Sequence, residues 1–239
     1  MCGNEHTLQS CFSSPLLESG EGICGVSHIS IWSRMPEPLR HELPVLNLLR
    51  QVFLSEPRGE LLRGIGKIAV PPEESGSFGL QLMIESVRKN ESRMADWREE
   101  LAAEFARLFI GPAHPPAVPF ASFYLAETRV LMSEETLNVR SRYLDAGFAV
   151  NEVHGAPDDH IGVELDFLFS VTSRIAQLTE ARQEHEAERF LKIRLGFLAD
   201  HFLRWVPLFA ERVIEFTGEE FYRGAASLLA EVVEYYRIH

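Results

Sequence analysis

One stretch decides how this chain is expected to fold: residues 155–168, GAPDDHIGVELDFL. It has the form of a loop that turns into a helix, because Pro157 disfavours helical backbone at the residue before it. Asp158 and Asp159 suit the N-cap and first turn, where carboxylates accept unpaired amide hydrogens and face the positive end of the helix dipole. The inward face of the predicted helix holds Ile161, Leu165, Leu168, Thr172 and Ile175. Asp159 and His160 are therefore expected at the mouth of a long helix, where a polar site can form, although an ordinary capped helix has the same pattern.

Apolar residues recur at intervals of three and four along most of the remaining chain, which is the pattern of amphipathic helices. The clearest case begins near Met94 and ends at Gly111 and Pro112. A further helix is expected from about Glu180 to Phe202, and its inward positions are Leu191, Leu195, Leu198 and Phe202. The spacing predicts an all-α fold of about nine to ten helices, in a single globular domain over residues 36–239, with no sheet of consequence.

A proline-rich segment divides this domain. Prolines 112, 115, 116 and 119 exclude regular helix between Gly111 and Phe120. The segment is either a semi-rigid hinge near residues 111–124 that joins two helical halves, or a shaped surface loop. Phe120, Phe123 and Tyr124 follow it and are suited to holding a peptide, but packing onto the core beneath the loop explains Phe123 and Tyr124 equally well.

Residues 1–35 differ from the rest of the chain. Glycine, serine and cysteine are frequent, helical periodicity is absent, and residues 23–32 have a strand-like texture. We expect a poorly structured N-terminal extension. All three cysteines, Cys2, Cys11 and Cys24, lie in it, so the core is not built on disulfides, and their spacing matches no compact metal site. No stretch has the form of a signal peptide or a membrane span, which predicts a cytoplasmic protein.

The composition narrows the classes of function. Hydrophobic residues make up 46% and charged residues 24%, which is ordinary for a soluble globular protein. The net charge is −12, from 35 acidic and 23 basic residues. This balance argues against a nucleic-acid binder, which needs a basic face, and is compatible with a cationic partner.

Motifs of enzymatic chemistry are absent from the sequence. It has no phosphate-binding glycine loop, no dinucleotide fingerprint and no Gly-x-Ser-x-Gly elbow. His160 and Glu164 lie one helical turn apart and resemble half of a metal site, but no second histidine has that spacing. His154, His185 and His201 are expected at the surface or at the edge of the core. We predict no catalytic residue, no metal site and no cofactor.

Three sequence blocks carry a resemblance to a known family. The first is the pattern Gly155-x-Pro157-x-Asp159-His160, continued by Ile161-Gly162-x-Glu164-Leu165-x-Phe167-Leu168. The second is the helix end FARLFIGP at residues 105–112, and the third is PFASFY at residues 119–124. Together they resemble the TorD/DmsD/NarJ family, cytoplasmic chaperones for molybdenum enzymes of the DMSO-reductase type. The resemblance runs from roughly residue 44 to the C-terminus and implies a TorD-like helical fold.

The resemblance also implies a ligand, the twin-arginine signal peptide of a client enzyme. Such a peptide has two arginines followed by an apolar stretch, so its recognition needs carboxylates and an aromatic or aliphatic groove. Asp158, Asp159 and Glu164 are expected to supply the carboxylates. The full set of predicted peptide-binding residues is Phe105, Leu108, Phe109, Pro119, Phe120, Tyr124, Pro157, Asp158, Asp159, His160 and Glu164. Leu108 and Phe109 have core packing as an equal alternative, and Gly155 stands where many relatives carry glutamate.

The function implied by the resemblance is that of a chaperone and not of an enzyme. It would bind the signal peptide and the apo form of a molybdopterin oxidoreductase, and it would delay export until the cofactor is inserted. One alternative is an assembly factor that binds guanine nucleotide or the molybdopterin cofactor. Another is a metal-dependent hydrolase centred on His160 and Glu164. No nucleic-acid partner and no stable membrane insertion are expected, and the chain is either a monomer or a homodimer, the latter possible through exchange of helical halves.

Overall fold

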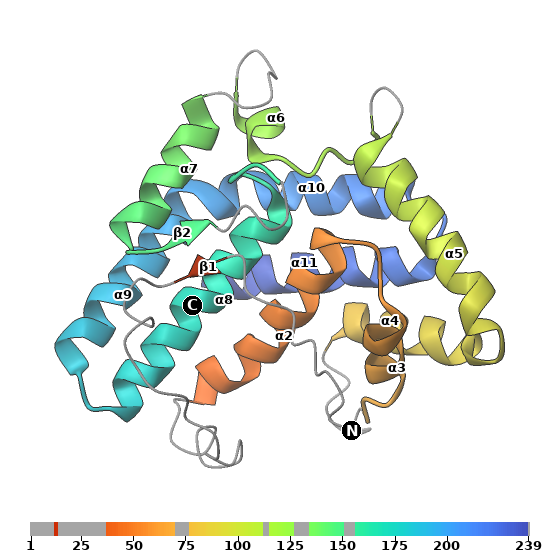
Figure 1. Ribbon diagram of the computed structural model, residues 1–239, viewed down its shortest axis with the longest axis horizontal. Coiled ribbons are helices and arrows are strands. Elements are labelled where there is room, and N and C mark those ends of the chain that lie inside the picture. Colours follow the sequence, from red (N-terminus) through yellow and green to blue (C-terminus); the bar gives the residue numbers. More distant parts are fainter. Residues whose placement is uncertain are drawn as a thin grey trace, which may run out of the picture.

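The computed structural model describes residues 12–13, 37–69, 77–111, 115–126, 134–150 and 156–238 (Figure 1). Before the proline-rich segment lie α2 (Glu37–Leu54), α3 (Gly59–Gly66), α4 (Phe78–Lys89) and α5 (Met94–Phe105). After it lie α6 (Ala121–Leu125), α7 (Glu134–Asp145), α8 (Ile161–Glu180), α9 (Glu184–Phe197), α10 (Leu203–Phe216) and α11 (Glu220–Ile238). A 3-10 turn (Glu91–Arg93) precedes α5, and π-helical turns extend α5 (Ala106–Ile110) and α9 (Leu198–Phe202). The prediction of an all-α fold is confirmed.

The sheet in the described part of the chain is minimal. Strand β1 (Phe12–Ser13) pairs antiparallel with β2 (Ala149–Val150), so that Phe12 lies opposite Val150. These two-residue strands agree with the expectation that no sheet contributes much to the fold. Most of the described core residues lie on helices.

Helix α8 lies at the centre of the molecule (Figure 1), and its first eight residues are all buried. It packs against α2 on one side and α9 on another, while α11 packs against α4 and α10. The inward face predicted for α8, from Ile161 to Ile175, is buried as expected. Helices α4 and α11 approach closely because both carry glycine at the crossing: a Cβ on Gly79 would lie 2.2 Å from the backbone nitrogen of Leu228.

Helices from the two sides of the proline-rich segment thus pack against each other, α2 with α8 and α4 with α11. The described part of the segment is held at defined points. The N–H of Ala117 donates to the carbonyl of Leu108 at 3.1 Å, and the Arg212 guanidinium donates to the carbonyl of Pro116 at 2.6 Å. Ala117 and Val118 are buried. From residue 115 onward the segment is therefore a shaped loop on the helices, and a hinge at residues 111–124 stays a prediction.

The inward face predicted for the helix after Glu180 is wrong at Leu191 and Leu195 and correct at Leu198 and Phe202. Leu191 and Leu195 are 39% and 48% exposed, whereas Phe190, Arg194 and Phe197 are buried. Two features explain the shift. The buried side of α9 accommodates a charged residue, Arg194, which a search for apolar positions passes over. The π-helical turn that follows α9 then changes the spacing of inward residues, so Leu198 and Phe202 are buried as predicted.

Some expectations fall on residues outside the described ranges. The strand-like texture at residues 23–32, His154 and the three cysteines are among them. The proposed extension at residues 1–35 stays a prediction. In the described part of the chain, no helix combines the length and the apolar character needed to cross a bilayer.

Candidate peptide-binding site

Helix α8 begins with a histidine cap. His160 has extended backbone, and its Nδ1 accepts a hydrogen bond from the N–H of Gly162 at 3.1 Å. The prediction that Asp158 or Asp159 would be the N-cap or lie in the first turn is wrong, because the helix begins after the histidine, at Ile161. The two aspartates lie in the turn before the cap and make their side-chain contacts outside this helix.

The imidazole of His160 is neutral at physiological pH. Burial lowers its pKa to about 4, against a smaller opposing effect of the Asp159 charge. With Nδ1 accepting from Gly162, the ring proton lies on Nε2. The ring of Phe120 packs edge-on against the imidazole, with 5.3 Å between centroids. A neutral His160 adds no positive charge beside the two carboxylates, so this part of the site stays anionic.

The start of α8 is joined to the loop before α6. The N–H of Ile161 donates to the carbonyl of Pro119, and the N–H of Ala121 donates to the carbonyl of Asp159, both at 2.9 Å. The carboxylate of Asp159 accepts from the N–H of Ser122 through Oδ2 at 3.0 Å. We call residues 119–124 and 157–160 the α6–α8 junction. It brings together two of the three sequence blocks, which lie more than thirty residues apart in the chain.

Asp159 is the most unusual residue of the junction. Its side chain has no exposure, and its second oxygen, Oδ1, has no hydrogen-bond partner in the described part of the chain. The hydroxyls of Ser122 and Tyr124 are likewise buried without a partner there. Buried polar atoms are nearly always paired, because an unpaired one loses its hydration without compensation. The junction therefore has spare hydrogen-bonding capacity.

Asp158 is buried as well, at 3% exposure, and its carboxylate is occupied. Arg140 of α7 donates from Nε to Oδ2 of Asp158 at 2.6 Å. From the same helix, the hydroxyl of Tyr143 donates to the backbone carbonyl of Asp158 at 2.9 Å. Helix α7 thus holds this turn in place through Tyr143 and pairs the Asp158 carboxylate through Arg140.

Glu164 lies deeper and does not reach a surface. Its Oε1 is 2.7 Å from Nε2 of His201, and its Oε2 accepts from Nε1 of Trp205 at 3.1 Å. Burial raises the pKa of Glu164, and the histidine partly offsets this. The expectation that His201 lies at the surface or an edge is wrong, since it is 3% exposed. Helical spacing from Phe197 would have placed His201 on the buried face, because Phe197, His201 and Trp205 recur at intervals of four.

The half metal site suggested by His160 and Glu164 is not assembled. His160 accepts through Nδ1 from Gly162, whereas both carboxylate oxygens of Glu164 contact His201 and Trp205, so the two side chains have different partners. Among the described residues, no three His, Cys, Asp or Glu side chains are grouped so as to hold a metal ion.

The predicted aromatic and aliphatic residues fall into two groups. Leu108 and Phe109 belong to the core, and the Phe109 ring packs against Phe53, Phe209 and Tyr222. Tyr124 packs against Trp205, and burial raises its pKa. Pro119 is buried, whereas Phe120 and Pro157 are half-buried. The structure therefore gives Leu108 and Phe109 the core role that the sequence left open, whereas Phe120 and Pro157 are partly exposed to solvent.

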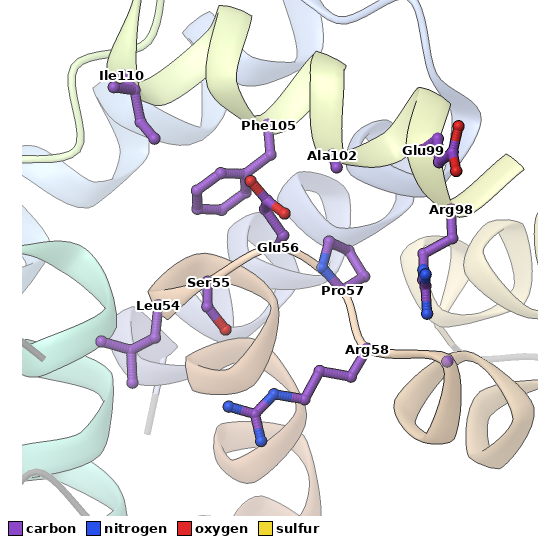
Figure 2. A pocket seen from close by; sticks show the side chains of 11 residues that line it. Leu54, Ser55, Glu56, Pro57, Arg58, Arg98, Glu99, Ala102, Phe105 and Ile110 are labelled. Carbon is purple, nitrogen blue, oxygen red and sulfur yellow. The ribbon is translucent and has the colours of Figure 1, made fainter. Parts of the chain in front are cut away.

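Phe105 lines a pocket of about 670 Å³ between α5 and the α2–α3 connection. Figure 2 shows its ring pointing toward the connection that carries Glu56 and Pro57. The exposed Ile110 contributes to the rim. The pocket adjoins the start of α8 through Leu54, because a Cβ on Gly162 would lie 2.5 Å from Leu54 Cγ. Sequence reasoning missed the α2–α3 side of this pocket, since no motif marks it.

The fold and the junction define an all-α protein whose candidate site offers carboxylates and aromatic side chains, the groups that bind basic and apolar peptide segments. The family model described as nitrate reductase delta subunit matches residues 76–211. Chaperone protein TorD of Vibrio parahaemolyticus is 31% identical over 168 residues, 70% of this chain and 74% of the relative. The protein of the same name from Vibrio vulnificus is 34% identical over 134 residues, 56% of this chain and 61% of the relative. The protein of the same name from Aliivibrio fischeri is 30% identical over 165 residues, which are 69% of this chain and 74% of the relative.

The chain belongs to the TorD/NarJ family of chaperones. This confirms the resemblance seen in the sequence. Chaperones are not enzymes, in agreement with the expectation of a non-enzymatic protein.

Proposed function

We propose that this protein is a cytoplasmic maturation chaperone for a molybdopterin oxidoreductase. It binds the twin-arginine signal peptide and the apo form of its client, and it delays export until the cofactor is in place. Membership of the TorD/NarJ family supports the chaperone role. The net charge of −12 supports a basic peptide as ligand, because an acidic field speeds the encounter with cations.

The observation that carries the proposal is Asp159 Oδ1, which has no hydrogen-bond partner among the described residues. A buried carboxylate that accepts one backbone N–H and leaves Oδ1 without a donor suits a guanidinium, which presents several N–H groups in a planar fork. Asp159 has no exposure, so the arginine reaches it only when the edge of α6 moves away from the turn before α8. Such a movement breaks the bonds that the N–H groups of Ala121 and Ser122 donate to Asp159, and the bonds of the arginine to the carboxylate offset part of this loss.

The apolar part of the peptide is proposed to lie along the pocket beside Phe105. Its wall includes Phe105 and Ile110, and Leu54 connects it to the start of α8. Leu108 and Phe109 support this wall from the core side. In this arrangement the junction is shaped by Pro119, Phe120, Tyr124 and Pro157. Glu164 holds α8 against α10 through its hydrogen bond with Trp205.

The test is calorimetry with a synthetic leader peptide that carries Arg-Arg before a run of leucine and alanine, and with a Lys-Lys version. Asp159→Ala is expected to weaken binding of the Arg-Arg peptide by about 2–5 kcal/mol, as when one partner of a buried charge pair is removed. His160→Ala should weaken it too, because the imidazole fixes the turn. Added salt should reduce the affinity of the unmodified protein.

A matched control is Asp200→Ala, which removes the same charge from a side chain that is 66% exposed. It should leave affinity nearly unchanged. Each variant needs a melting curve, since loss of the bond to Ser122 costs about 1–2 kcal/mol of stability on its own. If the Asp159 and His160 variants bind the leader as tightly as the unmodified protein, these residues only organise the helix start, and the peptide binds elsewhere.

A further inference from the structure

The junction already holds one guanidinium, and it comes from this chain. Arg140 of α7 donates from Nε to the Asp158 carboxylate at 2.6 Å. The two side chains differ sharply in exposure, 61% for Arg140 and 3% for Asp158. The carboxylate is therefore a buried acceptor, whereas the arginine reaches it from solvent.

The bond is of a kind that another arginine can replace. Arg140 uses a single N–H, and its two terminal nitrogens make no hydrogen bond to the described residues. A mostly exposed arginine gains little from one contact, because water and salt screen the charge and the long side chain loses rotamer freedom. A bidentate guanidinium from a peptide makes two parallel bonds to the same carboxylate and binds it more strongly.

The turn itself does not depend on Arg140. Tyr143, three residues further along α7, is buried and holds the backbone carbonyl of Asp158 at 2.9 Å. The backbone of the turn is also tied to the α6 loop through Asp159 and Ile161. When Arg140 leaves, Asp158 stays in place as a buried carboxylate, and leaving it unpaired is costly. The exchange of one guanidinium for another avoids that cost.

We infer that Arg140 is an internal competitor for the client's arginine at Asp158, and that it thereby lowers the affinity of the site for any leader that must displace it. This inference rests on the proposed function. A ligand must displace Arg140 to bind, which reduces its apparent affinity. An arginine of the leader overcomes the competition through its planar fork, whereas a lysine ammonium, a strongly hydrated point charge, does so poorly. Because both leaders must displace Arg140, it weakens both by the same factor, and the preference for Arg-Arg over Lys-Lys comes from the planar fork alone.

The experiment compares Arg140→Ala with Arg142→Ala by calorimetry, using the Arg-Arg and Lys-Lys leader peptides described above. Arg140→Ala should bind the Arg-Arg peptide about three- to tenfold more tightly, the range expected when a weak, partly exposed ion pair no longer competes. The Lys-Lys peptide should gain by the same factor, because it displaces the same side chain, so the ratio of the two affinities should stay constant.

Arg142→Ala is the matched control. It removes the same charge from the same helix, but Arg142 lies 3.7 Å from Asp200 and 3.5 Å from the Gly196 carbonyl, away from Asp158. Its affinity should stay close to that of the unmodified protein. An equal gain in both variants would trace the effect to net charge and overturn the inference. No gain, or a loss, in Arg140→Ala would overturn it too.

Two further measurements separate competition from a structural role. In an Asp158→Asn background, Arg140→Ala should no longer tighten binding, because the carboxylate for which it competes is gone.

In the unmodified protein, the Nε–H nuclear magnetic resonance signal of Arg140 should shift and exchange faster with water when the Arg-Arg peptide is added. An unchanged signal under saturating peptide would overturn the inference. A leader that binds neither the unmodified protein nor Arg140→Ala overturns the proposed function as well, whereas one that binds both equally overturns the inference alone.

Discussion

Two of the regions in which this molecule buries polar side chains differ in how completely those side chains are paired. In the described part of the chain, the buried side-chain atoms without a partner belong to residues between 122 and 159: Ser122 Oγ, the Tyr124 hydroxyl, Thr136 Oγ1 and Asp159 Oδ1. All lie in the α6–α8 junction or on α7, which packs against α6.

The second region lies where α2 crosses α8, and we call it the α2 ion-pair cluster: Glu42, Arg50, Asp166, Thr172, Arg194 and Tyr236. Arg50 pairs with Asp166 at 2.5 Å. Arg194 pairs with Glu42 and donates to the Thr172 hydroxyl at 3.2 Å, and the Tyr236 hydroxyl also contacts Glu42. Every polar side chain of this cluster has a partner.

The difference in pairing distinguishes polar side chains that hold helices together from those that we propose bind a ligand. A fully paired buried network fixes the geometry of neighbouring helices and has no capacity left for a ligand. A partly paired network costs stability, and a protein retains that cost where an incoming group completes the bonding. The α2 ion-pair cluster holds α2, α8, α9 and α11 together, and the junction is the place where we propose that a client binds.

The largest effect is expected from breaking the paired region. Arg50→Met leaves the Asp166 charge in the core without its guanidinium, so the free energy of unfolding should fall by about 3–5 kcal/mol in urea titrations. Arg98→Met on the exposed side of α5 is the control and should change it by less than about 0.5 kcal/mol. The part of the Arg50 variant that remains folded should bind the leader peptide normally. A loss no larger than the control's would remove the distinction between the two regions.

A smaller effect concerns the pH dependence of stability. The pKa of His160 is about 4 in the folded protein and 6.5 as the ordinary value, so the unfolded chain takes up the proton first as the pH falls. Stability contributed by the neutral imidazole is complete above 6.5 and is lost between about 6.5 and 4, by at most about 3 kcal/mol. The raised pKa of Glu164 acts in the opposite direction, because the folded state then holds a proton that the unfolded chain has released.

His160→Asn isolates the contribution of the imidazole. The asparagine side chain offers an oxygen to the Gly162 N–H and so keeps a cap, but it does not titrate. Urea midpoints of this variant should decline less steeply below pH 6.5 than those of the unmodified protein. Parallel declines in the two proteins would show that His160 titrates normally and is not held neutral by burial.

The sequence predicted the elements better than their polar contacts. Apolar spacing placed α5 and the inward face of α8, because burial repeats along a helix with a fixed period. The same spacing could not find the bond between Glu164 and His201, which lie 37 residues apart and meet only when α8 packs near the start of α10. Asp158 and Asp159 were assigned to the helix cap because carboxylates prefer that position, but a neutral imidazole at residue 160 accepts the amide instead.

The site shows the same division. The sequence blocks located the turn at Asp158 and Asp159 and the loop at Phe120, and the structure joins them through backbone bonds. The amino-acid sequence did not indicate that Arg140 would pair with one of these carboxylates, since nothing in the local pattern of α7 distinguishes Arg140 from Arg142. Long-range pairs of polar residues have no period, so only the folded arrangement identifies them.

The smallest expected effect compares two threonines, one from each region. Thr136 and Thr172 are both buried in helices, but the Thr172 hydroxyl accepts from Arg194 and the Thr136 hydroxyl has no partner in the described part of the chain. Valine has nearly the same shape as threonine and lacks the hydroxyl. Thr172→Val leaves an arginine N–H unpaired and should destabilise the fold by about 1–3 kcal/mol, whereas Thr136→Val removes an unpaired polar atom and should be neutral or stabilising by up to about 1 kcal/mol. Urea unfolding of both variants measures the two changes under one condition.

If Thr136→Val destabilises as much as Thr172→Val, a water molecule or an unrecognised donor pairs with Thr136, and the contrast between the two regions is smaller than the described contacts indicate. If Thr136→Val stabilises the fold while leader binding stays the same, the spare capacity of α7 is separate from that of Asp159, and the binding site narrows to the junction itself.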